Sequence, residues 1–211
     1  MVASFLHFIR HGEVYNPDKI LYGRLDGFKL SPKGLLMAER TARALSTRPI
    51  TKIYSSPLQR ARESAAPLSK LTSVEIVEDD RLIEGRNDFE GSKISPGAFL
   101  SNPSFIKSLR NPFLPSWGEP FREISNRMLS MAEEAWNSVD DGEVALVSHQ
   151  IAIWILHRTI AGIPLPHFPT QRRCSLSSVT TVRKVGNSWR EESYREPAAS
   201  LVGEAEDLGA V

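Results

Sequence analysis

The sequence has only one cysteine and no long apolar run. Cys174 is the single cysteine among 211 residues, so the chain forms no internal disulfide, and one thiol is too few for a cysteine-based metal site. The opening stretch, MVASFLHFIRH, has no basic leader, and His7 and Arg10 interrupt its apolar residues. That pattern is typical neither of a signal peptide nor of a membrane-spanning helix. We therefore expect a cytoplasmic protein with no membrane partner.

The sequence also lacks an excess of either charge. Lysine and arginine total 26 against 25 for aspartate and glutamate, a net charge of +1, which provides no overall field to attract nucleic acid. Apolar residues make up 41% of the chain and charged residues 24%, as in an ordinary globular protein. We expect one domain over residues 1–197, followed by a small, acidic and mobile tail at 198–211.

Strands and helices alternate along the sequence. Short apolar runs predict strands at 4–10, 51–55, 74–79 and 143–149, and apolar stripes at helical spacing predict helices at 32–46, 56–71, 119–139 and 150–162. Ser56 followed by Pro57 is expected to cap and open the second of these helices. A late hairpin is expected around Gly186 and Asn187. This order predicts an α/β fold, a three-layer sandwich in which a mostly parallel sheet has helices on both faces.

One region departs from this alternation. Residues 91–120 contain five prolines, at 96, 103, 112, 115 and 120, which exclude a long regular element. We expect an irregular insertion that acts as a lid over a site.

Polar residues follow the strands at the edge where parallel sheets bind ligands. Arg10 and His11 follow the first strand, His149 follows the strand at 143–149, and Arg60 lies in the first turn of a helix. Arginine binds phosphate oxygens through paired hydrogen bonds, and helix N-termini add backbone donors. The sequence therefore predicts a local anion site with proton-transfer capacity, and phosphate is the natural ligand.

The expected chemistry follows from the charges around His11. Neighbouring arginines disfavour a protonated imidazole, so the ring is expected to stay neutral and nucleophilic. A covalent phosphohistidine would split phosphoryl transfer into two steps. An acid must protonate the leaving oxygen, and Glu84 is the best-placed carboxylate, with Asp79, Asp80 and Asp88 as alternatives.

Four motifs in order resemble one known family. They are RHGE (10–13), SSPLQRARESA (55–65), LIE within RLIEGRNDFEG (81–91), and VALVSHQ (144–150). Over residues 4–185 the chain resembles the histidine phosphatase superfamily, with its phosphoglycerate mutase-like fold. The stretches NPFLPSWGEP (111–120) and REP (195–197) are similar to a small actinobacterial branch of it.

The resemblance implies a role for several residues. It implies that His11 is the phosphorylated nucleophile, that Glu84 is the proton donor, and that three residues hold the phosphoryl group: Arg10, Arg60 and His149. It also places Asn16, Tyr22 and Gly23 beside the phosphate, and Gln150 takes the place of the glycine that usually follows the second histidine. These last four are expected substrate-binding residues.

The resemblance favours a phosphatase over a mutase. Mutases of this family have an arginine-rich insertion that grips a second acidic group, whereas the insertion here has only three cations, Lys93, Lys107 and Arg110. We expect a metal-independent phosphohydrolase of small phosphomonoesters that needs no cofactor. The alternatives are a cofactor-dependent phosphoglycerate mutase, a phospho-ligand binding module with little turnover, and a metallohydrolase using the two histidines.

The remaining polar residues have less specific interpretations. His7, His157 and His167 are interpreted as packing or surface residues, and Cys174 as a small buried apolar side chain. Arg172 and Arg173 are interpreted as solvated surface residues, with the alternative that they bind the rest of the substrate. The sequence carries no signal for oligomeric state.

Overall fold

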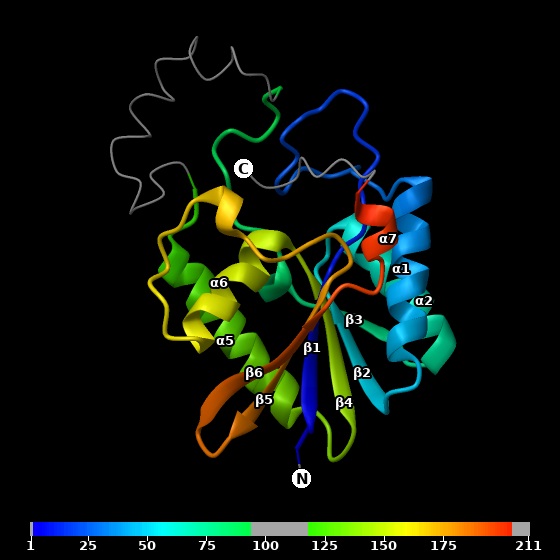
Figure 1. The fold of residues 1–211 in the computed structure, drawn as a ribbon, viewed down its shortest axis with the longest axis vertical. Helices are drawn as coiled ribbons and strands as arrows, with labels where there is room; N and C mark the ends of the chain where they lie inside the picture. Colours follow the sequence, from blue (N-terminus) through cyan, green and yellow to red (C-terminus); the bar gives the residue numbers. More distant parts are fainter. Residues whose placement is uncertain (1, 94–117, 204–211) are drawn as a thin grey trace.

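The fold is built on one six-stranded sheet. The computed structural model describes residues 2–93 and 118–203 (Figure 1). The strand order is β3-β2-β4-β1-β5-β6, and the first four strands run parallel, while β5 is antiparallel to both neighbours. The strands are β1 (Phe5–Arg10), β2 (Ile50–Ser55), β3 (Ile76–Glu78), β4 (Glu143–Ser148), β5 (Val179–Val185) and β6 (Ser188–Arg195). The mostly parallel sheet and the late hairpin are confirmed.

Helices cover both faces of this sheet. Helices α1 (Pro32–Leu45) and α2 (Gln59–Thr72) pack together on one face, and α5 (Phe121–Asn137) and α6 (Gln150–Ile160) pack on the other (Figure 1). Side chains of the central strands alternate between the two cores, since Val144 and Leu146 join the α5/α6 side while Ala145 and Val147 join the α1/α2 side. The predicted three-layer α/β sandwich is therefore present.

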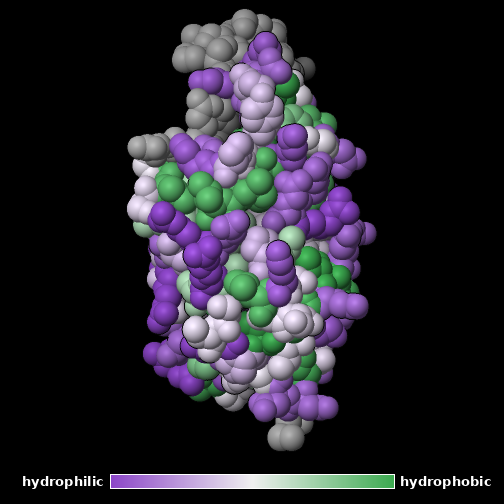
Figure 2. All heavy atoms as spheres, turned by 90° about the vertical axis from the view of Figure 1, so that its right-hand side faces the viewer, coloured by the Kyte–Doolittle hydropathy of each residue, from purple (hydrophilic) through white to green (hydrophobic). Residues whose placement is uncertain are grey.

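The outer surface of the α1/α2 layer is mixed in polarity. Figure 2 shows this side of the molecule, with hydrophilic residues interspersed among apolar ones. Leu35 and Leu36 on α1 are among the exposed apolar residues, while the opposite side of the helix buries Met37 and Ala38. The helix is amphipathic, but the apolar stripe expected from its spacing was wrong in including Leu35 and Leu36, since the inward face is formed by residues such as Met37 and Ala38.

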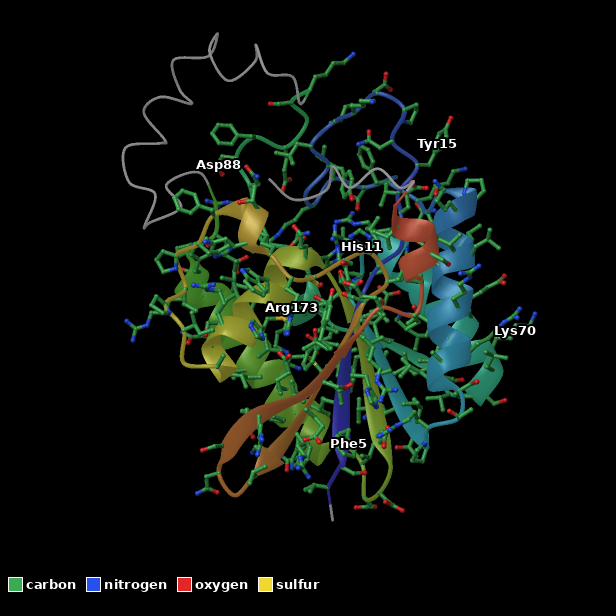
Figure 3. The ribbon with its side chains drawn as sticks, viewed as in Figure 1. Phe5, His11, Tyr15, Lys70, Asp88 and Arg173 are labelled. Atoms are coloured by element: carbon green, nitrogen blue, oxygen red, sulfur yellow. The ribbon has the colours of Figure 1, made fainter. Side chains whose placement is uncertain are left out.

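The register of the two central strands positions the site. Strand β1 pairs with β4 in parallel, and Arg10 lies opposite Ser148. The residues that follow the two strands, His11 and His149, are therefore neighbours at the carboxyl edge of the sheet. Figure 3 labels Phe5 and His11 at opposite ends of β1, and His11 is at the end that the loops cover.

Helix α2 begins later than the sequence pattern predicts. We expected Ser56 to cap a helix opening at Pro57, but the helix begins at Gln59 after Leu58, and Leu58 makes no side-chain cap. The Ser56 hydroxyl instead hydrogen-bonds His149 Nε2 at 2.8 Å. Its local hydrogen bond, from Leu58 N, is long at 3.4 Å, so the main partner of Ser56 is a residue distant in the sequence.

The C-terminal segment differs from the mobile tail that its composition predicts. Ala198 is fully buried beside Met37 and Leu176, and a short helix, α7 (Ala199–Val202), follows it. Small apolar residues allow this close packing. Residues 204–211 and most of the expected lid, 94–117, lie outside the described residues.

A buried ionic network closes the other end of the sheet. His7 donates from Nε2 to Glu143 at 2.7 Å, and its Nδ1 lies 2.9 Å from the Thr181 hydroxyl. Arg48 donates to both oxygens of Glu143, at 2.7 and 2.5 Å. Burial alone would raise the pKa of Glu143, but the hydrogen bonds from His7 and Arg48 lower it to about 2. His7 is thus a packing residue with a defined partner.

This network makes stability depend on pH. The pKa of Glu143 is lower in the folded chain than the ordinary value of 4.5, so its contribution is complete above pH 4.5 and lost as pH falls toward 2. We expect Glu143→Gln to lower the free energy of unfolding at neutral pH by roughly 3 kcal/mol. Urea unfolding from pH 7 to pH 2.5 should show the wild type converging on the variant.

The matched control is Glu78→Gln. Glu78 pairs with Arg62 at 3.3 Å, and both side chains are about half exposed, so this change should cost less than about 0.5 kcal/mol. A gap between wild type and Glu143→Gln that stays constant down to pH 2.5 would contradict the assignment.

Candidate active site

Two buried histidines form the centre of the site. The rings of His11 and His149 have centroids 5.1 Å apart, and both residues are nearly inaccessible to solvent. The backbone N–H of His11 donates to Ser148 O at 3.1 Å, which fixes the loop to the end of β4. His11 Nδ1–H donates to its neighbour's carbonyl, Gly12 O, at 2.8 Å. In the neutral ring this tautomer leaves the lone pair on Nε2.

The surroundings keep both rings neutral. Burial, followed by the positive charges of Arg60 and Arg10, lowers the pKa of His11 well below 6.5, and the hydrogen bond to Gly12 does not offset this. The pKa of His149 is also well below 6.5, first because of burial and then because of Arg60. At neutral pH the site therefore holds two uncharged imidazoles beside fixed positive charge, and for His11 this is the state expected from the sequence.

Arg60 and Arg10 supply that charge from two different elements. Arg60 is in the first turn of α2 and donates from NH2 to Gly23 O at 2.5 Å. Its guanidinium lies 4.8 Å from the centre of the Tyr22 ring, and its buried Nε has no hydrogen-bond partner. Arg10 ends β1 and donates from NH1 to Cys174 O at 2.6 Å. The buried guanidinium of Arg60 thus has an unused donor, and an anionic ligand would satisfy it.

Glu84 is held beside the second histidine. Its Oε1 accepts hydrogen bonds from Gly85 N at 2.8 Å and from Ile151 N at 3.2 Å. Ile151 belongs to the first turn of α6, directly after His149 and Gln150. The carboxylate is buried, and this connection places it at the same helix start as His149. Glu84 was considered together with Asp79, Asp80 and Asp88, and among these four the hydrogen bond to the start of α6 is described for Glu84.

A cluster of ions outside the centre holds the Glu84 loop, and sequence reasoning missed it. Arg24 donates from Nε to Glu84 O at 2.7 Å and from NH2 to Glu119 Oε2 at 2.7 Å. Arg127 also pairs with Glu119, at 2.8 Å, and donates to Arg81 O at 2.6 Å. These residues are far apart in the sequence, and no spacing pattern connects them.

The expected substrate-binding residues differ in their placement. The Tyr22 ring lies 6.4 Å from that of His11 and stacks on Phe28 at 5.2 Å. Gly23 has φ 37°, and a Cβ there would meet Glu90 Oε1 at 2.2 Å, so the position requires glycine. Asn16 uses both amide atoms on Ile20, at 2.8 and 3.1 Å, which closes its own turn. None of the contacts described for Asn16 reaches His11.

Two hydrogen-bonding groups of the site were assigned other roles from the sequence. Ser56, expected as a helix cap, is the partner of His149 Nε2. Cys174 is buried as expected, but its carbonyl is the acceptor for Arg10 and, at 3.5 Å, for Gln150 Nε2. Backbone acceptors have no residue-type signal, so a sequence pattern does not reveal them.

Two kinds of feature are absent from the part of the chain that the structure describes. Within residues 2–93 and 118–203, no group of three or more His, Cys, Asp and Glu side chains is arranged to hold a metal ion. In the same ranges, no helix has the length and apolar character needed to cross a membrane.

The low pKa of His11 can be tested through Arg60. Removing the guanidinium in Arg60→Gln takes away a positive charge that disfavours the imidazolium, so the pKa of His11 should rise toward 6.5 while burial keeps it below that value. Nitrogen-15 NMR titration of the His11 ring measures this directly. Arg62→Gln is the control, since Arg62 is on the same helix but pairs with Glu78 at the surface. Equal His11 pKa values in the two variants would contradict the electrostatic account.

Comparison with known proteins agrees with this geometry. The family model described as histidine phosphatase superfamily (branch 1) matches residues 6–197. The uncharacterized protein Rv0525 of Mycobacterium tuberculosis is 43% identical over 195 residues, covering 92% of this chain and 96% of the relative. The putative phosphoserine phosphatase 2 of Hydrogenobacter thermophilus is 32% identical over 138 residues, covering 63% of this chain and 67% of its own.

A mutase-named relative and a solved structure also match. The probable phosphoglycerate mutase GpmB of Yersinia enterocolitica is 28% identical, covering 85% of both chains. The solved structure of the mycobacterial glucosyl-3-phosphoglycerate phosphatase Rv2419c has a TM-score of 0.72 and 26% identity, covering 90% of this chain and 97% of that one. The family model spans nearly all of the described fold and includes every residue of the site, and this chain is an enzyme of the histidine phosphatase superfamily, branch 1.

Proposed function

We propose that the protein hydrolyses small phosphomonoesters through a phosphohistidine formed on His11, without a metal ion or other cofactor. The observation that carries this proposal is the neutral, buried His11 ring, whose Nδ1–H is fixed on Gly12 O. Its Nε2 lone pair is therefore the nucleophile. Arg10 and Arg60 supply the charge that holds a phosphoryl group in line with it.

In the first step, His11 Nε2 attacks phosphorus and the ester P–O bond breaks. Glu84 gives a proton to the leaving oxygen, so the alcohol departs neutral. In the second step, water attacks phosphorus, Glu84 takes the proton of the water, and the N–P bond breaks. Inorganic phosphate leaves and His11 returns to its neutral form, so both residues end as they began.

His149 acts as a hydrogen-bond donor in this scheme. In the scheme, the Ser56 hydroxyl is the donor of its 2.8 Å hydrogen bond with His149 Nε2. A neutral ring that accepts at Nε2 carries its proton on Nδ1, and that buried atom has no hydrogen-bond partner. A phosphoryl oxygen supplies the missing acceptor. The starts of α2 and α6 add backbone donors at the same edge.

The names of similar proteins support hydrolysis, but one of them supports mutase activity as the alternative. The solved neighbour and the Hydrogenobacter relative are both named as phosphatases, and the insertion at 91–120 has few cations. The GpmB relative carries the name of a mutase, so transfer back to a bound phosphoglycerate is the second candidate. A binding module with little turnover would need neither the acid Glu84 nor a neutral His11.

The nucleophile is tested by removing it. His11→Ala should lower phosphate release from 4-nitrophenyl phosphate by at least about 1,000-fold, because the attacking atom is gone. The assay is run in excess chelator, and acid-labile phosphoprotein is measured by quenched labelling. The control His157→Ala changes a histidine that pairs with Glu191 on β6, and it should keep wild-type turnover.

Each outcome of that assay separates the candidates. Wild-type phosphate release in chelator supports the hydrolase, whereas a requirement for added metal contradicts the proposed mechanism. Interconversion of 3- and 2-phosphoglycerate that outpaces phosphate release would favour the mutase. If no ester is turned over, the binding module is the remaining candidate.

The proton donor is tested by comparing leaving groups. Glu84→Gln should lower turnover of phenyl phosphate by about 100-fold or more. The loss should be much smaller for 4-nitrophenyl phosphate, whose phenolate departs without a proton. Single-turnover rates of phosphoprotein formation measure the step itself. Equal losses on the two esters would show that Glu84 acts on structure or binding instead.

A further inference from the structure

The loop that carries Glu84 is held along its backbone by other parts of the chain. Between residues 81 and 86, four carbonyl groups accept a hydrogen bond from outside the loop: Arg81 O from Arg127 NH1 at 2.6 Å, Leu82 O from Ser148 Oγ at 2.6 Å, Glu84 O from Arg24 Nε at 2.7 Å, and Arg86 O from Glu119 N at 2.9 Å. Each contact satisfies a backbone acceptor and fixes the path of the loop. The Glu84 carboxylate is therefore placed by the backbone as well as by its own hydrogen bonds.

Glu119 orients two of these donors at once. Its Oε2 accepts from Arg24 NH2 at 2.7 Å and from Arg127 NH2 at 3.1 Å, and its Oε1 accepts from Arg127 Nε at 2.8 Å. Each guanidinium uses a different nitrogen for its loop carbonyl. The side chain of Glu119 is only 12% exposed and that of Arg127 only 15%. One nearly buried carboxylate thus aligns the arginines that hold the two ends of the stretch from 81 to 84.

Glu119 also offsets two charges that would otherwise repel each other. Burial lowers the pKa of Arg24, the charge of Glu119 raises it, and the charge of Arg127 lowers it again. A neutral side chain at position 119 would leave two guanidinium groups next to each other with a weaker shared acceptor, and such cations turn towards water. Their hydrogen bonds to the loop carbonyls would then weaken.

A second carboxylate contacts the same loop without holding its backbone. Glu134 on α5 pairs with Arg81 NH2 at 2.7 Å, and its side chain is 55% exposed. The same guanidinium also pairs with Asp79 at 2.6 Å. Glu134 thus binds a loop side chain that has another partner, and it is the matched control for Glu119.

We propose that Glu119 is a positioning residue for proton transfer: through the two arginines it holds Glu84 within reach of the leaving oxygen. This inference rests on the proposed function, in which Glu84 is the proton donor. A general acid works only within hydrogen-bond reach of the atom that it protonates, so a small displacement of its loop lowers the rate of that step. Phosphoryl binding is assigned to Arg10 and Arg60 on β1 and α2, so the loss should depend on the leaving group.

The test compares two esters with different leaving groups. Phenolate needs a proton to depart and 4-nitrophenolate does not, so the acid is measured by the ratio of kcat/KM for phenyl phosphate to that for 4-nitrophenyl phosphate. We expect Glu119→Gln to lower this ratio by about 10-fold, which is part of the loss expected for Glu84→Gln. Glu119→Asp keeps the charge and should lose less. Glu134→Gln should leave the ratio at its wild-type value.

A double variant separates positioning from a general loss of structure. In Glu84→Gln the acid is already absent, so adding Glu119→Gln should lower the ratio no further. Arg24→Gln removes the donor to Glu84 O and should give the same fall and the same lack of additivity. This second variant keeps the test available if Glu119→Gln does not fold.

Three results would overturn the proposal. The first is an equal loss on the two esters in Glu119→Gln, because phosphoryl binding would then be affected. The second is a loss in the double variant that multiplies those of the single variants, since Glu119 would then act independently of Glu84. The third is a fall in Glu134→Gln as large as that in Glu119→Gln.

Amide hydrogen exchange separates this role from the reaction. The backbone N–H groups of Gly85 and Ile151 donate to Glu84 Oε1, so in Glu119→Gln both should exchange about 10-fold faster or more, while Leu146 in the middle of β4 keeps its wild-type rate. If both amides lose protection while the wild type turns over neither ester, Glu119 positions Glu84 and the hydrolase proposal fails. Unchanged exchange at both amides would show that Glu119 does not position Glu84.

Discussion

The parallel pairing of β1 with β4 is the constraint on which the rest of the site depends. Because Arg10 lies opposite Ser148, the residue after each strand is a histidine at the same edge of the sheet. A shift of one residue would reverse the faces of every side chain in β1 and separate the two rings. Both strands are buried on their two faces by helices, so the hydrophobic core itself determines where the imidazoles lie.

Burial then has two effects on the residues of the site, one on the histidines and one on Arg60. It removes water from His11 and His149, which lowers their pKa values and keeps them neutral. It also removes water from Arg60, whose Nε is left without a partner, and so raises the benefit of binding an anion there. A neutral nucleophile and a buried guanidinium with an unused donor thus arise from one cause. An exposed site with the same side chains would have neither property to the same degree.

The sequence predicts the centre of this site better than its surroundings, and the reason is physical. His11, Arg60 and His149 are determined by strand and helix ends, which leave periodic signals in the chain. Ser56 was misread because a serine before proline has the same local pattern whether it caps a helix or binds a distant histidine. Ala198 shows a second limit, since small residues indicate a tail by composition but also pack closely against Met37.

The Arg24 cluster shows why substrate choice is harder to predict than phosphoryl chemistry. Arg24 and Arg127 share Glu119, and Arg24 also holds the backbone of Glu84. On either side of residues 94–117, the backbone of Lys93 forms a β-bridge with Ile20, and that of Gly118 forms one with Asn87. The loops around the centre are therefore joined to one another by long-range contacts, while the two histidines of the centre are positioned by the strand ends of the sheet. Changes in these loops can alter which alcohol or acid is accepted while His11, Arg60 and His149 keep their positions.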